Sequence, residues 1–261
     1  MKLMEITDLN SKDMIKKRAD SGQITWKWPL IIVFARLFFA LLAQSLVEIL
    51  FFSASPSPYK SAGVWWPVYG TLIDVGCFIL ITGQVKKEGL RFQDLLNFDP
   101  HRLGRDVLVG LGFILWVFPL AMAGITGCSL LMFGSPQPPP TYSPLPVWAA
   151  VYSLLIFPAI WGVMEQCTYQ GYVLPRLEAL FSRPGPAIAI VAFGWGIQHI
   201  ALPLMFDWRY MAYRFLSFLP LAVISTLVYL RTRRLIPFIV AHWAVDMLGV
   251  LSGIIVPMLI K

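Results

Sequence analysis

The sequence predicts an all-α polytopic membrane protein, with about seven transmembrane helices around a buried polar cavity. Of its 261 residues, 57% are hydrophobic and only 13% are charged, which is about half the charged share of a typical soluble domain. The apolar residues gather in runs long enough to cross a bilayer core, which takes about 20 residues per helix. A few ionisable residues interrupt these runs. This composition excludes a soluble enzyme, a disordered protein and a nucleic-acid-binding protein.

Seven apolar runs follow one another along the chain. We expect spans at about 28–53, 64–85, 106–133, 146–174, 186–206, 210–230 and 235–260. The first run is not a cleavable signal peptide, because the segment before it is long and contains acidic residues, whereas a signal peptide begins with a short basic region. The expected organisation is a polar cytoplasmic tail over 1–25 and a single transmembrane domain over 26–261.

Two connections have a distinct character. Residues 88–105 alternate apolar and charged side chains in a pattern that predicts an amphipathic helix lying on the membrane surface. Residues 135–146 are rich in proline and uncharged, which predicts an extended external loop.

The basic residues predict the orientation. Sixteen Lys and Arg residues lie in the N-terminal tail and in the connections after spans two, four and six, and three lie in the other connections and at the C-terminus. Because basic residues are retained in the cytoplasm, we expect a cytoplasmic N-terminus and an external C-terminus.

Ionisable residues inside the spans are costly and are therefore candidates for function. They are Arg36, Glu48, Asp74, Glu165, His199, Arg214, His242 and Asp246. Arg36 and Asp74 are expected to form a structural ion pair. Arg214 is expected to extend to the external interface. The Gly249-x-x-x-Gly253 spacing is compatible with a close contact between helices.

Four of these residues predict a hydrolytic site. Helical rise allows Glu165, His199, His242 and Asp246 to line one cavity in the cytoplasmic half, and His242 and Asp246 share a helix face. A buried carboxylate beside imidazoles can activate water and stabilise an oxyanion. Zinc suits these ligand types, but the chain has no HExxH motif and no close pair of histidines. No cofactor is therefore expected.

Three short motifs carry a resemblance to a known family. They read Glu165-Gln-Cys-Thr-Tyr-Gln170-Gly, Trp195-Gly-Ile-Gln-His199 and His242-Trp-Ala-Val-Asp246, the last preceded by Phe238. In this order, on consecutive apolar helices, they resemble the Glu-Glu-x-x-x-Arg, Phe-x-x-x-His and His-x-x-x-Asn/Asp motifs of the CAAX protease and bacteriocin-processing family of intramembrane glutamic endopeptidases, also called CPBP or Abi. The resemblance covers about 146–255.

The resemblance implies an activity and roles for these residues. Glu165 and His199 would activate water, and His242 and Asp246 would support the oxyanion, with Gln166, Gln170, Trp195 and Phe238 in supporting positions. The substrate would be a membrane-associated or lipidated peptide or protein, cut by an integral protein of a bacterial cell membrane. Neither the particular substrate nor the oligomeric state follows from the sequence.

The first motif departs from the family pattern, because Gln166 and Gln170 stand where the family has Glu and Arg. They lie one helical turn apart, and replacing a whole buried ion pair by two amides that bond each other can be nearly neutral. Two alternatives stay open: an inactive scaffold, immunity or accessory factor, and a small proton-coupled carrier. The absence of repeated halves argues against a carrier.

Overall fold

The computed structural model describes residues 9–260, which form helices and no β-strand. Six helical segments are long and apolar enough to cross a membrane. The helices in chain order are α1 (Lys12–Asp20), α2 (Lys27–Ile32), α3 (Ala35–Val47), η1 (Glu48–Phe52), α4 (Pro58–Gly63), α5 (Trp66–Lys87), η2 (Phe92–Leu96), η3 (Pro100–Arg102), α6 (Leu103–Phe133), α7 (Val147–Leu155), α8 (Phe157–Gln166), η4 (Cys167–Val173), α9 (Leu174–Phe181), α10 (Pro184–Gln198), α11 (Trp208–Thr232), α12 (Ile236–Val250), η5 (Leu251–Ile255) and α13 (Val256–Leu259).

The predicted fold class is confirmed. The side chains that the bundle leaves on its outside are those of a lipid-facing surface: Phe51, Leu115 and Leu131 are 74%, 81% and 80% exposed. A water-facing surface would not carry so many large apolar groups. The chain is an integral membrane protein.

The fifth expected span is shorter than predicted. Helix α10 ends at Gln198, and the chain then runs without helix to Trp208. Pro203 explains the difference, because proline cannot donate to a helical hydrogen bond and disfavours helix at the residue before it. Gln44 of α3 holds this connection through hydrogen bonds to both the carbonyl and the N–H of Leu204, at 3.1 and 2.9 Å. As a result, His199 lies at a helix end.

The fourth span runs from α7 to α9 and departs from regular α-helix at two points. Its first break is at Ile156, before Pro158 in the first turn of α8. Its second is η4, a stretch of wider π-helical turns directly after Gln166. Such turns often occur at functional sites. Here they begin two residues after Glu165.

Two segments before α6 lie against the bundle, and the second is not the amphipathic helix that the sequence predicts. Helix α1 packs under α9, where Ile15 is buried and Lys12 lies 3.2 Å from Glu178. Residues 88–105 form only the short 3₁₀ turns η2 and η3, and Leu95 is buried in the core. Gly89 and Asn97 both have positive φ, which interrupts a continuous helix.

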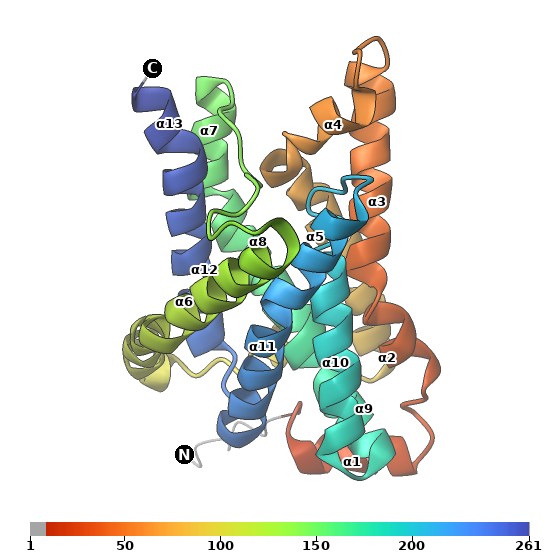
Figure 1. Ribbon diagram of the computed structural model, residues 1–261. Coiled ribbons are helices and arrows are strands. Elements are labelled where there is room, and N and C mark those ends of the chain that lie inside the picture. Colours follow the sequence, from red (N-terminus) through yellow and green to blue (C-terminus); the bar gives the residue numbers. More distant parts are fainter. Residues whose placement is uncertain (1–8, 261) are drawn as a thin grey trace.

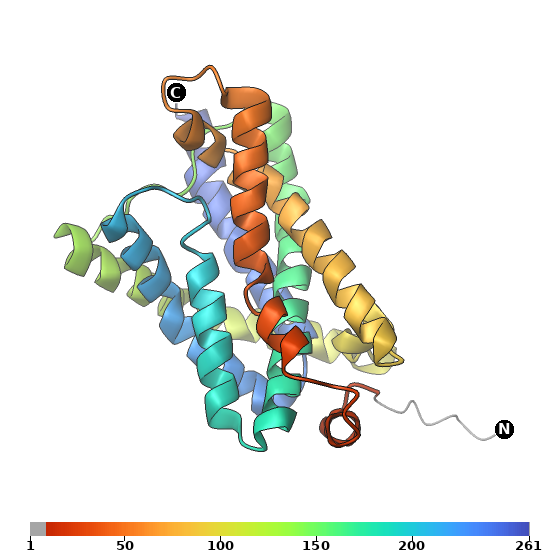
Figure 2. The ribbon, with the colours of Figure 1, turned by 90° about the vertical axis from the view of Figure 1, so that its right-hand side faces the viewer.

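Helix α6 lies obliquely across the other long helices, as the two views show (Figures 1 and 2). Its 31 residues would extend about 46 Å at 1.5 Å per residue, which is longer than a bilayer core and is accommodated by tilt. It crosses α11 closely at Gly124, where an added Cβ would lie 2.1 Å from the Ser217 carbonyl oxygen. Only glycine allows this approach.

Candidate active site

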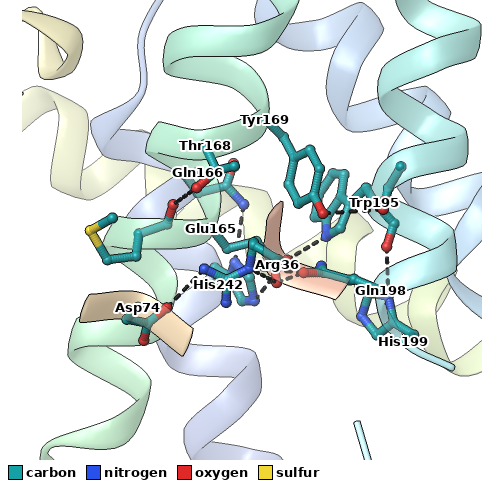
Figure 3. A network of polar contacts seen from close by, with 12 residues as sticks. Arg36, Asp74, Glu165, Gln166, Thr168, Tyr169, Trp195, Gln198, His199 and His242 are labelled. Atoms are coloured by element: carbon teal, nitrogen blue, oxygen red, sulfur yellow. Dashed lines mark hydrogen bonds and ion pairs between the residues drawn. The ribbon is translucent and has the colours of Figure 1, made fainter. Parts of the chain in front are cut away.

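Glu165 lies at the centre of a buried polar network (Figure 3). Its Oε1 accepts a hydrogen bond from Nε1 of Trp195, and its Oε2 accepts one of 2.7 Å from Nε2 of Gln198. Trp195 and Gln198 are three residues apart on α10 and so share a helix face. The last turns of α10 therefore fix the carboxylate with two N–H donors.

Arg36 of α3 brings a buried cation to the same carboxylate. Its Nη1 lies 2.8 Å from Oδ1 of Asp74, which confirms the expected ion pair. Its Nε donates to Oε1 of Gln198 at 2.8 Å and lies 3.7 Å from Oε2 of Glu165. The sequence did not predict these last two contacts. They make Arg36 a counter-charge for two buried carboxylates rather than for one.

His242 and Asp246 approach Glu165 from α12. Nε2 of His242 lies 3.7 Å from Oε1 of Glu165 and 3.4 Å from Oδ2 of Asp246. Nε2 of Gln166 donates to Nδ1 of His242 at 3.0 Å. With Nδ1 as the acceptor, a neutral ring carries its proton on Nε2. That N–H points to the space between the two carboxylates.

His199 reaches the network through Trp195. Its Nδ1 donates to the Trp195 carbonyl at 2.8 Å, and its ring stacks on Phe218 with 3.9 Å between centroids. Because Nδ1 is the donor, Nε2 of a neutral ring is free to accept a proton. Trp195 therefore contacts Glu165 with its indole and His199 with its backbone.

All four predicted residues line one cavity of about 970 Å³. Gln166, Trp195 and Phe238 of the supporting set line it as well, and Gln170 does not. Most of the remaining wall is apolar, including Val117, Met122, Trp161 and Leu221. The structure thus brings together a carboxylate and two imidazoles from three helices beside a space large enough for an extended peptide segment.

The cavity extends toward one end of the bundle. Its lining continues from His242 along α12 and η5 to Pro257 of α13, and α13 lies at the opposite end of the bundle from α1 (Figure 1). Under the orientation predicted from charge, the cavity extends into the external half, whereas the four residues are expected in the cytoplasmic half.

The proline-rich loop forms part of the cavity wall. Tyr142 packs against Trp66 with 5.1 Å between ring centroids, and Nε1 of Trp66 donates to the Thr141 carbonyl at 2.7 Å. An added Cβ on Gly253 would lie 2.5 Å from Cβ of Tyr142, and Gly249 contacts the same ring. The two glycines therefore receive a loop side chain and not another helix. Burial raises the pKa of the Tyr142 phenol.

Gln166 and Gln170 do not bond each other, so the expected amide pair is wrong. Gln166 turns to His242, whereas both amide atoms of the buried Gln170 are without a hydrogen-bond partner among the described residues. The π-helical turns of η4 begin between them. In a regular α-helix, Gln166 and Gln170 would lie on the same face, and the wider π-helical turns move them out of this register.

Arg214 is the largest departure from expectation among the ionisable residues. It does not extend to the interface but is 5% exposed and lines the cavity. Its Nη2 donates to the Leu202 carbonyl at 2.8 Å, and its Nε donates to the His199 carbonyl at 3.3 Å. Gln198 occupies an unspecified position of the second motif, and Arg214 lies outside all three motifs, so neither was predicted as a site residue.

Within residues 9–260, no group of three or more His, Cys, Asp and Glu side chains is placed to hold a metal ion.

The comparison with known families bears on this same part of the chain. Residues 146–248 match the Rce1-like family. That family is described as type II CAAX prenyl endopeptidase Rce1-like, and the match confirms the resemblance predicted from the three motifs. No curated protein and no solved structure matches the chain. The Rce1-like region runs from α7 into α12 and contains Glu165, His199, His242 and Asp246.

Proposed function

We propose that the protein is an intramembrane endopeptidase that hydrolyses a peptide bond of a membrane-associated or lipidated peptide or protein. The observation that carries the proposal is the convergence of Glu165, His199 and His242 on one cavity within an Rce1-like region. The apolar walls of that cavity suit a substrate that arrives from the lipid.

The two ends of the network support different roles in hydrolysis. A water molecule beside Glu165 gives a proton to the carboxylate, and its oxygen attacks the carbonyl carbon of the substrate. The free Nε2 of His199 accepts a hydrogen bond from this water and so orients it for attack. The Nε2–H of His242, fixed by Gln166, donates to the developing oxyanion, with Asp246 supporting the ring. Glu165 then returns the proton to the leaving nitrogen as the carbon–nitrogen bond breaks.

The test is peptide cleavage by the purified protein in liposomes. A library of N-acylated peptides is incubated with wild type, Glu165→Gln and His199→Ala, with and without a chelator, and products are identified by mass spectrometry. We expect wild-type cleavage to fall about a hundredfold or more in both variants, the usual contribution of a general acid–base group. Cleavage that is unchanged in folded Glu165→Gln contradicts the mechanism. Loss of cleavage with chelator alone would assign a metal.

A second candidate is an inactive Rce1-like scaffold that binds a partner. The unpartnered amide of Gln170, in the position of the family arginine, favours it. A scaffold would keep its cellular effect in Glu165→Gln, whereas a peptidase would lose it. A carrier would instead show flux across sealed vesicles without any cleavage product.

We also propose that the N-terminus is cytoplasmic and the C-terminus external, in a bacterial cell membrane. The uneven distribution of Lys and Arg between alternate connections supports this orientation.

A further inference from the structure

A buried cation stands beside the candidate active site without a carboxylate partner. Arg214 is 5% exposed, and it forms no ion pair with any acidic residue in 9–260. The other deeply buried arginines differ: Arg36 pairs with Asp74 at 2.8 Å and Arg176 with Glu88 at 2.6 Å. A charge at membrane depth without a counter-ion is costly.

The neighbours of Arg214 hold its guanidinium in place without neutralising it. The carbonyl oxygens of His199 and Leu202 accept from Nε and Nη2. Its guanidinium carbon lies 5.1 Å from the ring centre of Phe218, on which His199 stacks. Arginine has five N–H donors, so three remain for a ligand. Among the described residues, Arg214 is the one arginine or lysine that lines the cavity.

We propose that Arg214 binds a carboxylate of the substrate, next to the bond that is cut. This inference rests on the proposed function, because it assigns a substrate contact within the same cavity. A planar guanidinium matches a carboxylate with two parallel hydrogen bonds, and such a pair would supply the missing counter-charge. Because Arg214 also bonds the carbonyl of His199, a bound carboxylate lies close to that imidazole. The ligand is therefore an apolar peptide with an acidic group, at its chain end or on a side chain.

The test measures binding by the full chain in lipid nanodiscs. The probes are three N-dodecanoyl tripeptides of apolar residues: one with a free C-terminus, one amidated, and one amidated with a glutamate side chain. The protein is Glu165→Gln, so no probe is consumed. We expect one of the two acidic probes to bind about tenfold or more tightly than the amidated apolar one, and the tighter of them identifies the source of the carboxylate. Equal affinity for all three probes overturns the proposal.

Variants in α11 test whether Arg214 is the residue that causes the preference for acidic probes. In the Glu165→Gln background, Arg214→Gln should remove the preference for acid, and Arg214→Lys should retain part of it. Arg209→Gln, at an exposed position of the same helix, should leave it unchanged. If Arg214→Gln does not fold, the comparison of the three probes with Arg214 intact still tests whether the cavity prefers an acidic ligand. A preference for acid that persists in folded Arg214→Gln contradicts the assignment. Because binding is measured without turnover, acid preference without any peptidase activity would disprove the proposed function and leave the carboxylate site standing.

Discussion

Hydrogen bonds to Glu165 and His199 decide what each group can do. Trp195 donates to Glu165 through its indole and accepts from His199 through its carbonyl, so a single residue sets both the position of the base and the tautomer of the imidazole. Gln166 has the same effect on His242. Such supporting contacts keep a site within the narrow geometry that hydrolysis requires.

The two glutamines of the first motif should differ in their effect on stability. Burying an amide without a partner costs about 1–3 kcal/mol, so Gln170→Met should raise the free energy of unfolding by about 1 kcal/mol. Gln166→Met removes the donor to His242 and should lower it by about the same amount. Unfolding in detergent, followed by tryptophan fluorescence, measures both. Similar destabilisation by the two changes would show that Gln170 is not an orphaned amide.

For individual residues, the sequence predicted which side chains are buried at membrane depth better than it predicted where each side chain points. Glu165, His199, His242 and Asp246 were identified because ionisable groups are rare at membrane depth, and the Arg36–Asp74 pair followed in the same way. Arg214 was placed wrongly, since the end of α10 at Gln198 brings two free carbonyls to it. Tyr142 carried no signal at all, because a tyrosine in a proline-rich loop indicates no contact.

At the scale of elements, the apolar runs predicted the long helices, and local breaks accounted for the errors. Pro203 ends the fifth span early, and the positive φ of Gly89 and Asn97 breaks the expected surface helix. The π-helical η4 was not predictable, because wider turns leave no pattern in hydropathy. These breaks lie around the cavity or at the bundle ends, where the chain departs from regular helix.

The proline-rich loop should detach from η5 when a larger side chain replaces Gly253, on which Tyr142 packs. In Gly253→Ala the new Cβ overlaps Tyr142, and overpacking of this kind costs about 1–3 kcal/mol. The loop should then open about tenfold more often, so that chymotrypsin cleaves after Tyr142 correspondingly faster. Gly127→Ala is the matched control, because its Cβ would meet nothing within 4 Å. Equal cleavage rates in the two variants would show that Gly253 does not hold the loop.

At the scale of the whole molecule, two independent features define a direction across the membrane. The connections rich in Lys and Arg lie on the same side of the bundle as α1, and Arg176 with Glu88 holds that end together. The cavity extends the other way, toward η5 and α13 (Figure 1). If basic residues stay in the cytoplasm, a substrate reaches Glu165 from the external half of the bilayer.

Cysteine labelling in intact cells tests this direction. Ser252 is exposed and lines the cavity, and Lys17 is exposed on α1. Cys128 is replaced by serine to lower the background, and Cys77 and Cys167 are already buried. A maleimide that cannot cross membranes should label Ser252→Cys in intact cells and Lys17→Cys only after the cells are permeabilised. Because Ser252 and Lys17 lie toward opposite ends of the bundle, the reverse labelling pattern would place the cavity on the cytoplasmic side. The substrate would then enter the cavity from inside the cell.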